Sequence, residues 1–343
     1  DLPKNKTGWG HLYHRSTRAD TVYRHCMKSI DLVLNKRLGR NGLPLIQTGD
    51  WNDGLDEIGS EGIGESVWLG FFLYYILSNL LDVIEKQDGA EARQYYTDRL
   101  DQLKEALEAS WRGDRYLRAY HDDGTEIGVK GSGIWEIDAL TVAWAVYCGI
   151  NEERETTAFH TALDILEKDN AVLLGWPALR EDSKPYLGRS SKYPEGVREN
   201  GMYCHGVQWM LRASRILTER AEERGDKDKA AEYREIGYRL WRKITPVGHV
   251  VPEEIEVYGG QPNKQQADVL TNYDRGRMIW NGYTGAAGWL FRQSFEGVVG
   301  AQLVKNHMVL PGDLDKARGK LKVKTIKREL DKSPLTEIER YRS

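Results

Sequence analysis

Three short segments of this chain combine carboxylates, aromatic rings and glycines in patterns that could carry chemistry. The densest, TGDWNDGLD (48–56), places Asp50 and Asp53 around a Trp and an Asn in a glycine-bounded loop, and GESVW (64–68) follows it. Such a loop can present a sugar-stacking ring beside a carboxylic acid, and partial burial against that ring would favour the protonated acid that glycosidic cleavage requires. An Asx-rich turn capping a helix that begins near Glu65, or a calcium loop, is an alternative interpretation.

The second segment, YPEGVRENGMYCH (193–205), places a carboxylate, an arginine and a histidine at the start of a helix expected over 202–224. A helix N-terminus favours anions, and a nearby histidine can donate a hydrogen bond to one. Alternatively, Asn200 is the helix N-cap and His205 is a core residue. Cys204 and His205 are consecutive and point apart on a helix, so a thiol nucleophile is not expected.

The third segment is WNGYTGAAGW (280–289), in which a Thr-Gly pair opens a helix of small residues. The threonine hydroxyl and the free backbone N–H groups of such a helix can bind an oxyanion. No Gly-Lys-Ser/Thr follows, so the segment is not a P-loop. Close helix packing around Trp289 is the structural alternative.

The composition narrows the class of ligand. The 343 residues contain 49 Lys+Arg against 52 Asp+Glu, and this balance excludes a dedicated binder of nucleic acid. The 11 Trp and 18 Tyr far outnumber the 5 Phe. Tyr and Trp pair a flat apolar face with a polar group, which suits a hydrated, ring-shaped ligand.

Three widely spaced cysteines without a CxxC indicate a reducing compartment, and the charged opening DLPKNKTGWG does not resemble a signal peptide. We therefore expect a cytoplasmic protein. The most apolar stretch, 67–83, has 17 residues and includes Asn79 and Asp82, so it predicts a buried core helix and no membrane span. The first residues resemble the middle of a domain, and we expect the chain to be part of a longer polypeptide.

The elements that position these segments are mainly helical. Apolar periodicity predicts helices near 18–38, 65–87, 90–110, 136–149, 153–168, 202–224, 227–243 and 283–299. Short extended pieces are expected at 116–120 and 249–258, and long loops at 39–64, 121–135, 176–201 and 250–282. Helix pairs whose long loops gather at one rim suggest an α/α toroid over 1–300. Alternation after Gly300 predicts a small β-rich segment over 301–343.

In this order, GDWNDG with GESVW, YPEGVRENG…H and YTGAAGW…EGVVG resemble the C-terminal half of glycoside hydrolase family 94, over residues 20–312. That family includes cellobiose, cellodextrin, chitobiose and 1,2-β-oligoglucan phosphorylases and the phosphorylase-like module of cyclic β-1,2-glucan synthase. The resemblance implies an (α/α)6 barrel of twelve helices behind an N-terminal β-sandwich. Because only eight helices are expected here, it implies an incomplete barrel and a longer polypeptide that supplies the rest. Homodimers are frequent among family relatives.

The resemblance also implies residue roles. Asp53 would be the general acid. The sugar would contact Trp51, Asn52, Arg198, Glu199 and Tyr283, and inorganic phosphate would bind to His205, Thr284 and the Gly285 backbone.

The reaction implied is inverting phosphorolysis of a β-linked gluco-oligosaccharide to an α-sugar 1-phosphate. Phosphate is the co-substrate, and neither a metal nor a further cofactor is expected. Phosphate is already anionic, so one catalytic carboxylate suffices, whereas a water nucleophile would need a base. Two alternatives remain open at this point: an inverting hydrolase in which Glu199 or Glu195 activates water, and a glycan-binding module without turnover.

Overall fold

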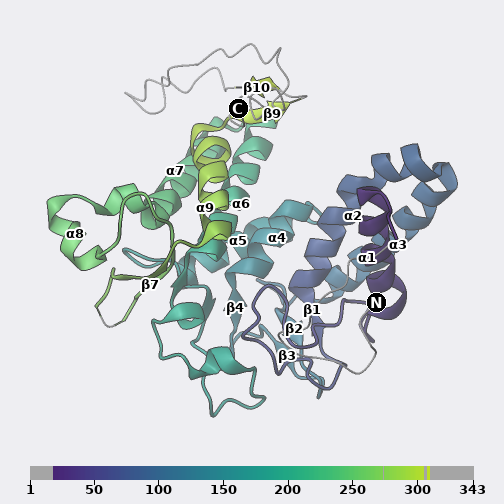
Figure 1. Ribbon diagram of the computed structural model, residues 1–343, viewed down its shortest axis with the longest axis horizontal. Coiled ribbons are helices and arrows are strands. Elements are labelled where there is room, and N and C mark those ends of the chain that lie inside the picture. Colours follow the sequence, from purple (N-terminus) through teal and green to yellow (C-terminus); the bar gives the residue numbers. More distant parts are fainter. Residues whose placement is uncertain (1–17, 273, 305–306, 310–343) are drawn as a thin grey trace. The chain divides into compact units, whose positions relative to one another are not determined.

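The computed structural model describes residues 18–272, 274–304 and 307–309, and the chain divides into two compact units, Asp1–Val298 and Val299–Ser343. The first unit is mainly helical (Figure 1). In the second, strands β9 (Gln302–Val304) and β10 (His307–Val309) form an antiparallel pair, as the alternation after Gly300 predicts. The rest of the predicted β-rich segment, 310–343, lies outside the described residues.

The eight predicted helices are present with boundaries shifted by a few residues. They are α1 (Val22–Lys36), α2 (Val67–Asp88), α3 (Ala90–Ala109), α4 (Ala139–Cys148), α5 (Glu152–Leu166), α6 (Cys204–Glu223), α7 (Lys227–Ile244) and α9 (Thr284–Gln293), which continues into a π-helical turn over Ser294–Val299. The left-handed Gly149 ends α4, as its position after the apolar run predicts.

One predicted extended piece is wrong. Within 249–258 the chain forms a 3-10 turn (Pro246–His249) and a short helix, α8 (Pro252–Tyr258). Pro252 at the first helical position, two glutamates in the first turn and a left-handed Gly259 at the end are all helix signals. A segment of seven residues is too short for helical periodicity to be recognised in the sequence.

Helices α2, α4, α6 and α9 pack side by side in that order, and α3, α5 and α7 each pack against the preceding helix of this row. Every helix of the row follows a short strand, namely β1 (Glu65–Ser66), β4 (Ile137–Asp138), β6 (Met202–Tyr203) and β8 (Met278–Asn281). Figure 1 shows β1 to β4 gathered below α2 and α4. The N-termini of these four helices and the long loops therefore lie at one rim.

The short strands complete small antiparallel sheets at that rim. β1 pairs with β2 (Ala119–Tyr120), which pairs with β3 (Glu126–Ile127), and β4 pairs with β5 (Gly175–Trp176). β7 (Gln266–Val269) lies between β6 and β8. β2 lies within the extended piece predicted at 116–120, whereas β7 and β8 lie in a predicted loop.

Helix α2 is long and apolar enough, by composition, to cross a membrane, and 39% of its most apolar window is buried. Its buried side chains lie on one side, against α3 and α4. Within the first unit it serves as the core helix that the sequence predicts.

A buried charge network joins the loop over 48–56 to the starts of α2 and α4. Arg118, only 1% exposed, donates from Nη1 and Nη2 to Asp50 at 2.7 and 2.8 Å, and from Nε to Asp138 at 3.1 Å. Asp50 also accepts from the hydroxyl of Ser66, the N-cap of α2, and Asp138 is the N-cap of α4. Burial alone would lower the pKa of Arg118, but the two carboxylates outweigh it and keep the guanidinium charged.

We predict that Arg118→Leu lowers the free energy of unfolding by about 3–5 kcal/mol, because it leaves two buried carboxylates without their cation. Urea denaturation followed by circular dichroism measures this change. As a matched control, Arg93→Leu removes ion pairs with the exposed Asp82 and Glu85 and should cost less than about 1 kcal/mol. Equal losses in the two variants would show that the Arg118 network does not hold the rim together.

Candidate active site

The loop over 48–56 is shaped by two Asx turns. Asp50 Oδ1 accepts from the Asn52 backbone N–H at 2.9 Å, and Asn52 Oδ1 accepts from that of Gly54 at 3.1 Å. Gly49 has a φ of 120°, and a Cβ there would lie 2.9 Å from the Asp53 Cα atom. The Asx-turn interpretation is therefore correct for Asp50, which supports the cap of α2 through Ser66.

Asp53 projects from this loop into solvent. Its side chain is 80% exposed, and Oδ2 lies 2.7 Å from Arg189 Nη2, at the start of a 3-10 turn over Arg189–Lys192. Asp56 accepts from the Arg189 backbone N–H at 2.8 Å and fixes that turn beside the loop. The expectation that Asp53 is partly buried against an aromatic ring is wrong, because the turn directs Trp51 inward and Asp53 outward.

Trp51 lies edge-on to a cluster of rings at the start of α6. Its ring centroid is 5.2 Å from those of Tyr203 and His205 and 5.3 Å from that of Trp209. These contacts are packing contacts, and they join the loop to the first turn of α6. Trp51 therefore positions His205 as well as lining the rim.

His205 faces the start of α9. A Cβ placed on Gly285 would lie 3.5 Å from His205 Cε1, and Thr284 and Gly285 are both exposed. Tyr283, the N-cap of α9, makes no side-chain cap, so the first N–H groups of α9 have no cap acceptor. His205 Nε2 is buried without a partner among the described residues, and burial lowers the pKa of His205 to about 4. This places a neutral imidazole beside a helix N-terminus that can bind an anion.

Glu199 lies near Asp53 in a 3-10 turn over Arg198–Asn200. It is 5% exposed, and Oε2 has no hydrogen-bond partner in the described part of the chain. Burial raises the pKa of Glu199, and the charge of Asp53 adds to that increase. Arg198 Nη2 lies 3.5 Å from Glu199 Oε1, and Arg198 Nη1 donates to the Tyr283 hydroxyl at 3.3 Å. The predicted sugar-binding residues Arg198, Glu199 and Tyr283 therefore meet.

Arg198 adopts a φ of 54°, a left-handed conformation that non-glycine residues rarely adopt. Its guanidinium lies over the rings of Tyr193, Tyr203 and Trp280, at 5.6, 5.3 and 5.3 Å from their centroids. Such strain persists where surrounding contacts hold a residue in place, and it is frequent at functional sites.

Asp268, in β7, is a further acidic residue of this site that the sequence did not single out. It is fully buried, 3.9 Å from Arg198 Nη1, and neither carboxylate oxygen has a hydrogen-bond partner in the described structure. Burial raises its pKa to about 7. Its sequence signal is an acid inside the short run QADVL, within the loop predicted over 250–282.

Three other candidates lie apart from this cluster or play structural roles. Asn52 is buried beneath the loop, with Oδ1 holding the Gly54 turn and Nδ2 unpartnered among the residues described. Glu195 is exposed and lines a cavity beside Trp176. Burial raises the pKa of the Cys204 thiol, which is consistent with an unreactive core residue.

Asn200 is not the N-cap of α6, which is Tyr203. Its amide instead accepts from the Leu179 backbone N–H at 2.8 Å and donates to the Tyr193 carbonyl at 2.7 Å. Asn200 thus joins two segments of the long loop over 176–201.

Residues 11–300 match the family model of the glycosyl hydrolase 94 superfamily, catalytic domain. The chain is 35% identical over 285 residues to the cyclic beta-(1,2)-glucan synthase NdvB of Rhizobium meliloti (strain 1021), a match that covers 81% of this chain and 10% of that protein. It is 28% identical over 296 residues to the solabiose phosphorylase of Paenibacillus borealis, which covers 82% and 35%.

A third relative is the 3-O-beta-D-glucopyranosyl-beta-D-glucuronide phosphorylase of Paenibacillus borealis, 25% identical over 301 residues that cover 85% of this chain and 36% of that protein. The chain thus spans between a tenth and about a third of the length of these relatives.

We predict that the His205 imidazole titrates near pH 4, well below its usual value of 6.5, and that phosphate raises this pKa. The unfolded chain takes up its proton first, so the contribution of His205 to stability falls as the pH drops from about 6.5 towards 4. Histidine NMR chemical shifts measured from pH 3 to 8, with and without phosphate, test both points. An unperturbed titration that phosphate leaves unchanged would remove His205 from an anion site.

Proposed function

The chain belongs to the glycosyl hydrolase 94 superfamily, and from this premise we propose that it is the catalytic side of an inverting phosphorylase of β-linked gluco-oligosaccharides. The phosphorylases among its relatives support this reaction class. The observation that carries the proposal is the juxtaposition of His205 with Gly285 at the start of α9, next to the loop that bears Asp53. An enzyme that uses phosphate needs an anion site close to its acid.

In the proposed reaction, phosphate attacks the anomeric carbon from the face opposite the leaving group. The bond from that carbon to the glycosidic oxygen breaks, and Asp53 gives its proton to the departing oxygen, which becomes a hydroxyl of the shortened sugar. One inversion converts a β-linkage to an α-sugar 1-phosphate. The attacking oxygen is already anionic, so the mechanism requires no general base.

Asp53 must hold a proton to act as the acid, whereas in this structure it is exposed and paired with Arg189. We propose that a bound sugar covers the loop over 48–56 and separates Asp53 from Arg189. Both the loss of water and the loss of the cation favour the protonated carboxyl. Arg189 would then be free to contact the sugar or phosphate.

The remaining polar atoms suit the two substrates. The free Oε2 of Glu199 can accept a hydrogen bond from a sugar hydroxyl, and Trp51 borders the same space. Phosphate would receive hydrogen bonds from the Thr284 hydroxyl, the Gly285 N–H and the neutral His205 ring. Asn52 acts through the loop that it holds rather than by direct contact.

For the fold, we propose that α2, α4, α6 and α9 form part of the inner wall of an (α/α)6 barrel and that α3, α5 and α7 form part of its outer wall. Their order of packing supports this arrangement. The remaining helices and the β-sandwich would come from a longer polypeptide. We also propose that the protein is cytoplasmic, that the chain divides into 1–300 and 301–343, and that it forms a homodimer.

An inverting hydrolase is a second candidate, because the charge of Asp53 acts on Glu199 and Glu199 Oε2 has no hydrogen-bond partner among the described residues. The test is to incubate the longest available form with β-1,2-, β-1,3- and β-1,4-gluco-oligosaccharides, with and without phosphate. Sugar 1-phosphate formed only with phosphate supports the phosphorylase. Free sugar in both conditions supports the hydrolase, and no product from a full-length parent supports a glycan-binding module.

We predict that Asp53→Asn lowers the rate of sugar 1-phosphate formation by about 10²–10⁴-fold, because it removes the transferable proton. Asp56→Asn, which alters the contact with Arg189 but leaves Asp53 in place, is the matched control and should cost much less. Asp50→Asn cannot serve as that control, because Asp50 is bound to Arg118 and its loss should lower stability. Equal rate losses at 53 and 56 would mean that the loop is purely structural.

For His205→Ala, we predict that the phosphate concentration needed for half-maximal rate rises while the affinity for the sugar changes little. The reason is that His205 faces Gly285 rather than Glu199. Steady-state rates at varied phosphate and varied sugar separate the two effects. A rise in the sugar requirement alone would contradict this assignment.

A further inference from the structure

Three cavities lie next to one another along the long loop over 176–201 and the segments 271–272 and 274–276. Their volumes are about 550, 260 and 480 Å³. The first two share Trp176, Ala178 and Glu195 as lining residues, and the second and third share Arg275. Neighbouring cavities share lining residues, and we call the three together the flank groove.

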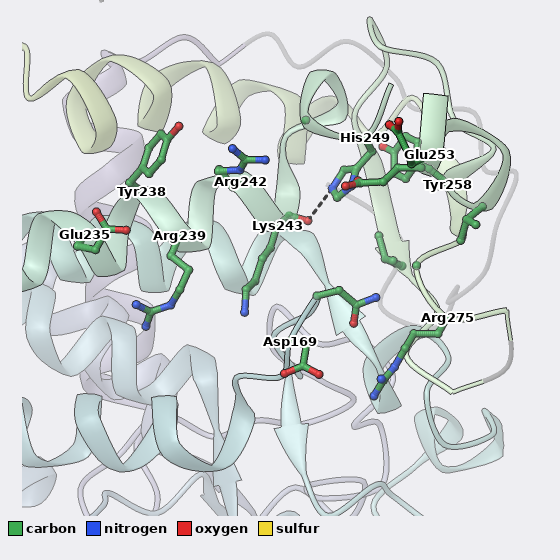
Figure 2. Close-up of a pocket in the computed structure, with 16 residues that line it drawn as sticks. Asp169, Glu235, Tyr238, Arg239, Arg242, Lys243, His249, Glu253, Tyr258 and Arg275 are labelled. Atoms are coloured by element: carbon green, nitrogen blue, oxygen red, sulfur yellow. Dashed lines mark hydrogen bonds and ion pairs between the residues drawn. The ribbon is translucent and has the colours of Figure 1, made fainter. Parts of the chain in front are cut away.

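Aromatic side chains occur along the whole flank groove. Trp176 is 39% exposed, with Lys168 Nζ 5.8 Å from its ring centroid, and Tyr193 is 37% exposed. In the third cavity, Figure 2 shows Tyr238 on α7, whereas Tyr258 is only 1% exposed and stacks on His249. Exposed flat rings with polar edges, such as those of Trp176 and Tyr193, are the surfaces on which sugar rings stack.

Charges in the flank groove are nearly balanced. Figure 2 shows Arg239 and Lys243 projecting from α7 towards the side of Asp169. Both cations are bound to Glu167, so they offer little free positive charge.

Among the residues that the structure describes, several charged side chains of the flank groove have no ion-pair partner, and they are of both signs. They include the acidic Asp169, Glu195 and Glu235 and the basic Arg242 and Arg275. A polyanion would gain little from this arrangement, whereas a neutral polyhydroxylated chain can both donate to the acids and accept from the arginines.

The flank groove is connected to the candidate active site through a single turn. The charge of Asp53 acts on Glu199, and the next residue, Asn200, forms hydrogen bonds with the backbone of Leu179 and Tyr193, which line the groove. The Arg198 guanidinium lies over the Tyr193 ring. Ser191, another wall, is 5% exposed, and its hydroxyl has no hydrogen-bond partner in the described part of the chain.

We propose that the flank groove binds the distal units of a gluco-oligosaccharide whose other end reaches the active site, with Trp176 as its central stacking platform. The identity of the ligand rests on the proposed function, and the groove itself rests on the cavities and rings. The consequence is a preference for chains long enough to contact Trp176 as well as the active site.

The test measures binding rather than turnover. Isothermal titration of the Asp53→Asn chain with linear β-1,2-, β-1,3- and β-1,4-gluco-oligosaccharides of two to eight units gives affinity against length. We expect affinity to rise with length for one linkage. Adding Trp176→Ala should weaken binding of the longest chains about tenfold and leave the disaccharide unchanged, as loss of one stacking platform implies.

The matched control is Tyr95→Ala, which removes a ring of similar exposure (44%) on α3, outside the flank groove. Arg275→Gln, at the junction of two cavities, should weaken only chains that extend beyond Trp176. Affinity independent of length, or equal losses from Trp176→Ala and Tyr95→Ala, would overturn the proposal. Length-dependent binding without phosphorolysis would retain the flank groove and reject the proposed reaction.

Discussion

The rim depends on the buried contact of Arg118 with Asp50 and Asp138. Each carboxylate also fixes a separate piece of backbone: Asp50 holds the turn that carries Asp53, and Asp138 caps α4. Buried ion pairs of this kind seldom add much net stability, because desolvation offsets their attraction. Their value here is geometric, since one guanidinium with fixed donor directions sets the positions of three chain segments. The location of Asp53 relative to α2 and α4 follows from that constraint, and the packing of Trp51 joins the same loop to α6.

Around this frame, polar groups are left buried without partners, which is unusual away from a ligand site. Glu199 Oε2, the Asp268 carboxylate and His205 Nε2 are all unpartnered among the described residues, and they lie on neighbouring elements of the rim. Burial keeps the histidine neutral and raises the pKa values of both acids. In the proposed complex, a bound sugar or phosphate would supply the hydrogen bonds that these groups lack. Their burial would therefore favour polar ligands over apolar ones.

The helices were predictable because each has a long apolar face, and the segments at 193–205 and 280–289 were found because their residue types are unusual. Three features needed the three-dimensional structure. α8 is too short for periodicity to register. Asp268 looks like a loop residue in the sequence, because its burial comes from the pairing of β7 with β6 on one side and β8 on the other. The direction of Asp53 depends on Asx turns and on Arg118, which is 68 residues from its partner Asp50 in the sequence.

The most direct test of the account is the anomeric configuration of the first product, read by proton and phosphorus NMR during turnover with phosphate. A single displacement assisted by Asp53 predicts an α-sugar 1-phosphate as the initial product from a β-linked substrate. A β-sugar 1-phosphate would require two displacements and a nucleophile on the protein. That result would contradict the assignment of Asp53 as the one catalytic carboxylate.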